Sequence, residues 1–400
     1  MNKTLAISPI KVLHIAPTPF FSDRGCHIRI QGVVNSTKSH NVNSVVCTYH
    51  HGREVQGVRT ERIRSIRGYE NTKAGPDSFK YLADLKLLLL ACKLVVRERP
   101  DVIHAHLHEG VLVGWLVKTL FFWRRVPLFA DIQGSLVGEL DSFDYFAGRQ
   151  WLRIIFQTIE YLIVRMPSRL MCSSIAALNT LRDQFRVSAD RLQLLADRID
   201  ISTFETVALV TRSDINIPEN KIVVVYSGSL LPSKGLHELH KIMQALLQQR
   251  NDVHFLIIGY PTDETEYFLT KNKLRGRCSV IGRVPYEELP GYLKIADIGV
   301  DPKDSDAGEG SGKIVNYMAA KLPVVCFDTD NNRELLGDNA EFVSRGDIDA
   351  VVQRLALLAD DEGLRHRLGK ANHARVQQHL SWDSAGRIIR SLYDQALGRT

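Results

Sequence analysis

The sequence predicts an α/β protein of two successive domains, each built on a parallel β-sheet. Short apolar runs alternate with amphipathic stretches at the spacing of βαβ units, which is typical of such sheets. The alternation restarts at Lys221 (KIVVVY) after an irregular stretch, residues 204–218. The length of 400 residues also agrees with two or three domains.

The first half alternates strands and helices from its beginning. Its predicted strands cover residues 11–16, 43–48, 101–105, 126–130 and 169–173. Its predicted helices begin near Cys26 and cover residues 79–96, 111–122 and 151–165. This half, residues 1–204, is expected to be one Rossmann-like domain.

The second half repeats the pattern. Its predicted strands cover residues 221–226, 253–259, 280–282, 298–300 and 323–327, and its predicted helices begin at Leu236 and cover 286–295 and 313–320. Residues 205–378 are therefore expected to form a second Rossmann-like domain, followed by a terminal helix in 379–400. Ligands of such sheets bind at the carboxyl ends of the strands, so the two sets of ends are expected to face one cleft.

The composition is that of an ordinary globular protein, with 44% hydrophobic and 24% charged residues. The net charge of +6 is compatible with a nucleotide or an acidic lipid surface. The sequence has no RNA-binding signature, so a nucleic-acid partner is not expected. The six scattered cysteines contain no CxxC pair, which indicates a cytoplasmic setting. No apolar run is long enough to span a membrane, and residues 11–16 fit a strand and not a signal peptide.

A glycine-rich loop followed by a helix, GEGSGKIVNYMAAKLPVV (308–325), is the most informative stretch. Gly310, Ser311 and Gly312 would let the backbone approach a ligand, and the helix N-terminus would offer N–H groups to a diphosphate. Lys313 adds a positive charge, and Asn316 could hydrogen-bond a ribose. A flexible loop before a helix is the alternative interpretation.

Two further strand–loop–helix junctions carry similar residues. SGSLLPSKG (227–235) contains Ser229 and Lys234, and the lysine could reach the same diphosphate. Gly25 follows the first strand and would permit close approach of a ligand. Either junction alone is compatible with an ordinary βα turn.

Other patterns allow two interpretations each. His104, His106 and His108 could bind a metal, although a strand end is the favoured interpretation. Residues 328–330 (DTD) match a DxD metal motif, although a capped turn is favoured. The segments 111–125 and 151–169 mix Trp, Phe and Arg, so they suit either a membrane surface or core packing.

Taken together, these motifs resemble those of the group 1 glycosyltransferases, which are retaining enzymes with the GT-B fold. The resemblance extends over nearly the whole sequence. It is carried by KVLHIAPTPFFSDRGCHIRI, PDVIHAH, LLADRIDISTF, VVVYSGSLLPSKG, VIGRVPYEELPGYLKIADIGVDP and GEGSGKIVNYMAAKLPVV. SWDSAGRIIRSLY resembles the family's C-terminal helix, which crosses back to the N-terminal domain.

The resemblance implies a role for each candidate residue. Lys234, Lys313 and Glu309 would be catalytic, the lysines neutralising the diphosphate leaving group and Glu309 contacting the donor sugar. The remaining donor-binding residues would be Gly25, Ser229, Arg283, Gly310, Ser311, Gly312 and Asn316. The first domain would bind the acceptor near His106 and Gln133.

Three positions depart from the family pattern. Ser229 stands where the family often has Arg, Asn316 where it usually has Glu, and Gln133 where many members have a histidine. Glu309 lies seven residues before Asn316, one residue short of the usual spacing. We expect Asn316 to be an adaptation that leaves Lys313 unpaired and free to face the phosphates.

The resemblance predicts transfer of a sugar from a nucleotide-diphosphate sugar to a glycan or lipid-linked acceptor, in cell-surface polysaccharide synthesis. No metal or other cofactor is expected. The enzyme would be cytoplasmic, and an anionic membrane surface at the inner face is a compatible partner. Two alternatives stay open: a catalytically inactive partner subunit, which Ser229 and Asn316 motivate, and a sugar-nucleotide epimerase.

Overall fold

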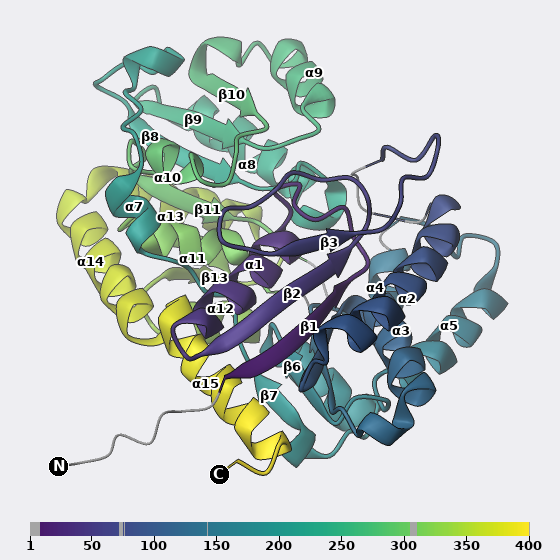
Figure 1. Cartoon of the computed structure of the whole chain (residues 1–400). Helices are drawn as coiled ribbons and strands as arrows, with labels where there is room; N and C mark the ends of the chain where they lie inside the picture. The colour runs from purple at the N-terminus through teal and green to yellow at the C-terminus, as the bar shows by residue number, and fades with distance from the viewer. Residues whose placement is uncertain (1–8, 72–74, 76, 142, 305–309, 400) are drawn as a thin grey trace, which may run out of the picture. The chain divides into compact units, whose positions relative to one another are not determined.

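The computed structural model describes residues 9–71, 75, 77–141, 143–304 and 310–399 (Figure 1). Contacts divide these residues into two compact units. The first unit contains the chain up to Ala196 together with Gly310 and residues 382–399, and the second contains residues 197–304 and 311–381. The sequence analysis had placed the boundaries at residues 204 and 378.

The first unit is built on a parallel sheet, as predicted. Among the described residues its strand order is β3-β2-β1-β4-β5-β6-β7, and all neighbours run parallel. The strands are β1 (Ile10–Ala16), β2 (Val42–Thr48), β3 (Thr60–Arg62), β4 (Val102–His106), β5 (Leu128–Ile132), β6 (Arg169–Cys172) and β7 (Leu192–Leu194).

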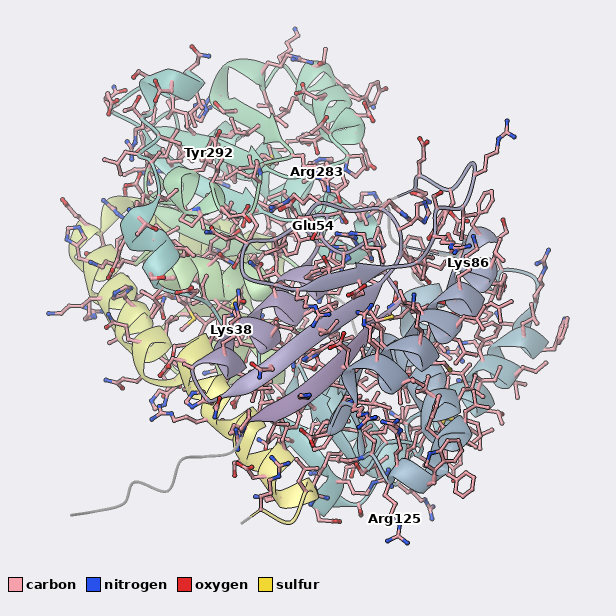
Figure 2. All side chains as sticks on the ribbon, in the orientation of Figure 1. Lys38, Glu54, Lys86, Arg125, Arg283 and Tyr292 are labelled. Carbon is pink, nitrogen blue, oxygen red and sulfur yellow. The ribbon has the colours of Figure 1, made fainter. Side chains whose placement is uncertain are left out.

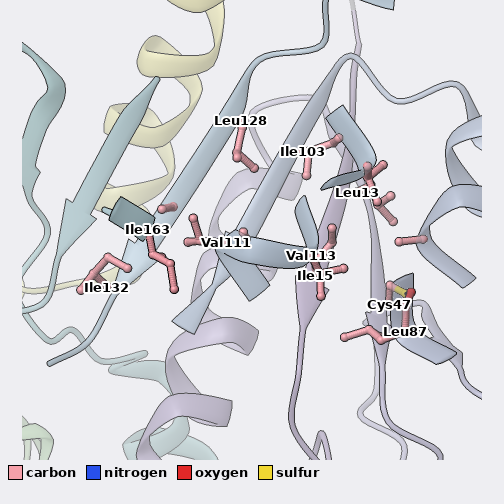
Figure 3. Close-up of a cluster of buried hydrophobic side chains, with 14 of the residues drawn as sticks. Leu13, Ile15, Cys47, Leu87, Ile103, Val111, Val113, Leu128, Ile132 and Ile163 are labelled. Carbon is pink, nitrogen blue, oxygen red and sulfur yellow. The ribbon is translucent and has the colours of Figure 1, made fainter. Parts of the chain in front are cut away.

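Helices cover both faces of this sheet because successive strand residues point to opposite sides. Leu13 and Ile15 pack into one apolar cluster with α2 and α3 (Figure 3), whereas Ile10 and Val12 pack into another with α15. The helices are α1 (Gly25–Lys38), α2 (Phe79–Glu98), α3 (Leu107–Leu120), α4 (Leu136–Asp141), α5 (Gln150–Ile163), α6 (Ile175–Asn179) and α15 (Trp382–Ala396).

The C-terminal helix α15 belongs to the first unit, which confirms its predicted return to the N-terminal domain. Glycines on both helices let α1 and α15 approach closely: a Cβ on Gly32 would lie 2.0 Å from the Trp382 ring. The Arg390 guanidinium adds hydrogen bonds to the carbonyls of His40 and Asn41.

The second unit has its own parallel sheet, in the order β10-β9-β8-β11-β12-β13 among the described residues. Its strands are β8 (Ile222–Ser227), β9 (Val253–Ile258), β10 (Cys278–Gly282), β11 (Ile298–Asp301), β12 (Val324–Phe327) and β13 (Glu341–Val343). Its helices are α7 (Ser202–Thr206), α8 (Leu236–Gln249), α9 (Asp263–Lys271), α10 (Leu289–Leu293), α11 (Gly312–Ala319), α12 (Asp330–Leu336), α13 (Ile348–Asp360) and α14 (Glu362–His379). Within the described part of the chain, no helix is long and apolar enough to cross a membrane.

Candidate functional site

In the second unit, the buried phenol of Tyr226 gathers three residues that the sequence analysis singled out. β8 and β11 are neighbours, so their carboxyl ends meet at one edge of the sheet. The Tyr226 hydroxyl lies 3.0 Å from the carbonyl oxygen of Ser229, 3.2 Å from that of Lys234 and 3.4 Å from the Lys313 ammonium. One side chain of β8 thereby connects the 227–235 loop to the start of α11.

Lys313 forms a buried ion pair, which corrects the expectation that it is unpaired. Its Nζ lies 3.0 Å from Oδ1 of Asp301, the last residue of β11. Burial disfavours both charges, but each group stabilises the other, so the pKa of Lys313 is raised and the pKa of Asp301 is lowered. Sequence analysis did not detect Asp301, although its place at a strand's carboxyl end was a usable signal.

The side chain at the N-cap of α11 does not cap the helix. Ser311 occupies the N-cap position, but its side chain does not cap the helix, because its Oγ donates to Oδ2 of Asp301 instead. The N–H groups at this helix start therefore donate no hydrogen bond to the Ser311 hydroxyl, and such groups are suited to an anion. Gly312 begins the helix and is exposed. Glu309 lies outside the described residues.

Asn316 is buried one turn into α11, with only 7% of its surface exposed. Its Nδ2 donates to the carbonyl of Gly312 at 2.8 Å. Its Oδ1 has no hydrogen-bond partner among the described residues. Burial raises the pKa of the Tyr286 phenol, and the contact between this phenol and Asn316 opposes that rise. Asn316 and Tyr286 are thus brought together.

The loop that carries Lys234 packs tightly against the backbone at Pro302. Lys234 ends a 3₁₀ turn, η5 (Pro232–Lys234), and Gly235 follows with φ of +86°. A Cβ on Gly235 would lie 2.4 Å from the carbonyl oxygen of Pro302, so only glycine fits there. Arg283, labelled in Figure 2, is exposed and stacks its guanidinium 4.9 Å from the ring centre of Tyr260, beyond β9.

In the first unit, the buried Asp131 lies between the two acceptor-side candidates. Asp131 accepts a bidentate hydrogen bond from Arg29, and this ion pair lowers its pKa despite burial. His106 Nδ1 and Gln133 Nε2 each lie 3.5 Å from Oδ2 of Asp131. His106 is fully buried, whereas Gln133 is half-buried.

Three histidine rings form a buried stack on β1 and β4. His14 Nδ1 lies 3.0 Å from His106 Nε2, and His104 Nδ1 lies 2.5 Å from the hydroxyl of Tyr393 on α15. His14 and His104 have pKa values far below the usual value, because burial disfavours their charged forms and neighbouring histidines add to the effect. His104 and His106 therefore end a strand, as favoured, while His108 lies on α3 beside Glu160.

The remaining metal motif is a helix cap, as predicted. Thr329 caps α12 by accepting a hydrogen bond from the N–H of Asn332, and Asp328 pairs with Arg333. Among the residues that the structure describes, no group of three His, Cys, Asp or Glu side chains is placed to hold a metal ion. Gly25 begins α1 and is exposed, and a Cβ there would meet no atom within 4 Å. Packing therefore does not require glycine at this position.

Two parallel-sheet units joined by a returning C-terminal helix define the class of GT-B glycosyltransferases. Sucrose-phosphate synthase from Thermosynechococcus elongatus shares this fold, with a TM-score of 0.80 and 16% identity over 98% of this chain and all of that structure. The model of glycosyl transferases group 1 matches residues 210–375, and that of the glycosyl transferase 4-like domain matches residues 24–197. The chain belongs to the group 1 glycosyltransferases.

Curated relatives agree with this membership at low identity. The capsular polysaccharide biosynthesis glycosyltransferase CapM of Staphylococcus aureus is 22% identical over 84% of this chain and 88% of the relative. The UDP-Gal:alpha-D-GlcNAc-diphosphoundecaprenol alpha-1,3-galactosyltransferase of Escherichia coli is 20% identical over 71% of this chain and 72% of the relative. The chain is thus similar to glycosyltransferases over most of its length.

Proposed function

We propose that this glycosyltransferase is a retaining enzyme that moves a sugar from a nucleotide-diphosphate sugar to a glycan or lipid-linked acceptor in cell-surface polysaccharide synthesis. The observation that carries the proposal is the junction at the carboxyl ends of β8 and β11, where Tyr226 connects Ser229, Lys234 and Lys313. A diphosphate at this edge would meet the first turn of α11 and a lysine-bearing loop.

The donor phosphates are proposed to bind at the N-terminus of α11. Because Lys313 is paired with Asp301, its charge is partly balanced, and the α11 amides and Lys234 would supply more of the attraction than Lys313. The Lys313–Asp301 pair would instead hold the helix start in place. Glu309 would contact the donor sugar and Arg283 the base side of the nucleotide, with Asn316 near the ribose.

Catalysis would rest on stabilisation of the leaving diphosphate. Negative charge accumulates on this group as the bond to the sugar breaks, and preorganised N–H groups and lysines stabilise it. In a retaining reaction by same-face attack, a donor phosphate oxygen accepts the proton of the acceptor hydroxyl. Such a course needs no carboxylate nucleophile, unlike that of retaining glycosidases. No metal ion is invoked in this proposal.

The acceptor is proposed to bind the first domain, at the sheet edge that carries His106 and Gln133. Two relatives support the choice of acceptor: one is named for capsular polysaccharide synthesis, and the other for transfer to a sugar on diphosphoundecaprenol, a lipid carrier. An acceptor of this kind would place the enzyme at the cytoplasmic face of a membrane.

Donor hydrolysis without acceptor tests the proposal. Purified protein is incubated with a panel of UDP- and GDP-sugars, and release of the nucleoside diphosphate is measured together with binding by calorimetry. We expect binding and slow release with one donor, and release should be abolished by Lys234→Ala. Binding without any release would favour the inactive-subunit alternative, and release of a free epimerised sugar would favour the epimerase.

A further inference from the structure

The first unit exposes an unusual number of large apolar side chains on adjoining helices. Helix α3 contacts both α2 and α5, so the outer surfaces of the three helices are continuous, and they lie together in Figure 1. We call this surface the apolar face. Its exposed residues are Tyr81, Leu82, Leu85, Leu89 and Val96 on α2, Leu112, Trp115 and Leu120 on α3, Phe122 and Trp123 on η1 (Phe122–Arg124), and Trp151, Ile154, Ile155, Ile159 and Leu162 on α5.

Helix α5 presents its apolar side outward. Within this helix, all of which the structure describes, only Glu160 and Ile163 are buried. Trp151 is 63% exposed and Ile154 is 65% exposed. The exposed apolar residues recur at the three- and four-residue spacing of one helix side. A helix that only packed on the sheet would bury this side, so α5 is built to contact something else.

The aromatic residues of η1 extend the same surface. Phe122 is 72% exposed and Trp123 is 63% exposed, and both precede Arg124 and Arg125. Arg125, labelled in Figure 2, is exposed, as is Lys93 on α2. Aromatic rings next to arginine are typical of segments at a membrane–water interface, where the ring enters the lipid and the cation meets phosphate.

Most carboxylates on these helices already have hydrogen-bond or ion-pair partners within the protein. The Tyr49 hydroxyl donates to Asp84, Arg59 and Arg97 pair with Glu98, and Glu160 accepts from the N–H groups of Leu136 and Val137. Asp141, which ends α4 next to α5, pairs with Arg153. Arg97 and Arg153 are balanced by these pairs, whereas Lys93, Arg124 and Arg125 take no part in them. These three basic groups favour an anionic partner.

We propose that the apolar face docks the enzyme on an anionic lipid bilayer, with the side chains of α5 and η1 inserted among the headgroups. A second copy of the chain fits less well, because it would bring to the interface a second set of the same basic groups and no compensating negative charge. The inference rests on the proposed function for its purpose, since a membrane-bound acceptor must be met at the lipid surface.

Vesicle binding tests the docking surface without any donor or acceptor. Vesicles of equal parts phosphatidylglycerol and phosphatidylcholine are titrated into the protein, and tryptophan fluorescence and co-sedimentation are measured. The chain has four tryptophans, of which Trp115, Trp123 and Trp151 lie on the apolar face and Trp382 is buried. We expect a blue shift and retention that is stronger at low salt. The variant Trp151→Ser/Ile154→Ser should lose affinity at least about tenfold.

A matched control distinguishes binding through the apolar face from nonspecific binding to lipid. Leu209 and Tyr267 of the second unit are 76% and 67% exposed, so Leu209→Ser/Tyr267→Ser should bind vesicles like the wild type. Absence of wild-type binding, equal loss in both double variants, or a dimer that Trp151→Ser/Ile154→Ser dissociates would overturn the inference. Donor hydrolysis in solution is followed in parallel, because it should be unaffected by Trp151→Ser/Ile154→Ser. A protein that hydrolyses donor but ignores vesicles would refute only the docking surface.

Discussion

Lys313, at the start of α11, and Asp301, at the end of β11, form an ion pair of 3.0 Å inside the second unit. The Lys313 ammonium also lies 4.4 Å from the ring centre of Tyr226. The pair fixes the start of α11 to the sheet, so its structural role and any role in binding must be separated by experiment.

Lys313→Ala should destabilise the protein by about 3–5 kcal/mol, because it leaves the buried Asp301 carboxylate unpaired. Lys313→Met/Asp301→Asn removes both charges and should recover much of this loss. Urea unfolding measures the free energies, and calorimetry measures donor affinity in the variants that stay folded. If the double variant is stable and binds the donor as the wild type does, Lys313 has no direct part in phosphate binding.

Lys234→Ala should weaken nucleotide-diphosphate binding by about 1.5–3 kcal/mol, the usual range for a hydrogen bond to a charged group. The backbone of Lys234 would still accept the Tyr226 hydrogen bond, so the loop should keep its conformation. Lys241→Ala on the exposed side of α8 is the control and should leave affinity unchanged. Equal affinity in both variants would place the phosphates elsewhere.

Asn316→Glu should lower both stability and donor affinity. The position is buried, and Glu cannot donate to the Gly312 carbonyl as Asn316 does, so the carboxylate would be repelled there. A glutamate at this position would not gain Lys313 as a partner, since Asp301 already pairs with that lysine. Asn316→Ala, which adds no charge, should bind donor better than Asn316→Glu. Tighter binding or new turnover with Glu would support the inactive-subunit alternative.

Gly25→Ala should leave stability unchanged or raise it by up to about 1 kcal/mol, since alanine favours helices and a Cβ meets nothing there. We nevertheless expect slower donor turnover, because glycine at this position is proposed to admit the phosphates. Gly32→Ala is the contrasting variant and should unfold more easily, since its Cβ would collide with Trp382. Unchanged turnover in Gly25→Ala would remove Gly25 from the site.

Acidification should weaken the first unit. His14 and His104 have lowered pKa values when folded and ordinary values near 6.5 when unfolded. Below about pH 6.5 the unfolded chain binds more protons, so the free energy of unfolding falls as the pH drops. Urea unfolding at about pH 7.5 and about pH 5 should show a steeper loss for wild type than for His14→Asn. Parallel losses would mean that the histidine stack is not the source.

The sequence was sufficient to predict two parallel-sheet domains, because most strands are continuous apolar runs, as buried parallel strands require. The three-residue strands β3, β7 and β13 were missed, since so short a run has no recognisable period. Helices α13 and α14 follow the last motif and were not predicted either.

The candidate site was predictable only in part. Glycines and lysines at strand–loop–helix junctions can be recognised in the sequence, because the residues of such a junction lie close together along the chain. Tyr226 cannot: it is the penultimate residue of the apolar strand β8, and its role comes from a contact with Lys313 across 87 residues of chain. Asp301 ends β11, which was a usable signal, but nothing in the sequence marks Lys313 as its partner. A single sequence does not encode such long-range partners in any local pattern.

The return of α15 to the first unit also constrains the order in which the protein is made. Phe129 and Val12 are buried against Ile389 and Tyr393, which leave the ribosome only after the whole second unit. Until then the first domain has one uncovered apolar sheet face, while all of the second domain is already available to fold. The second domain of this enzyme can therefore finish folding before the first, although it is synthesised later. A truncation before Trp382 would leave the first domain aggregation-prone.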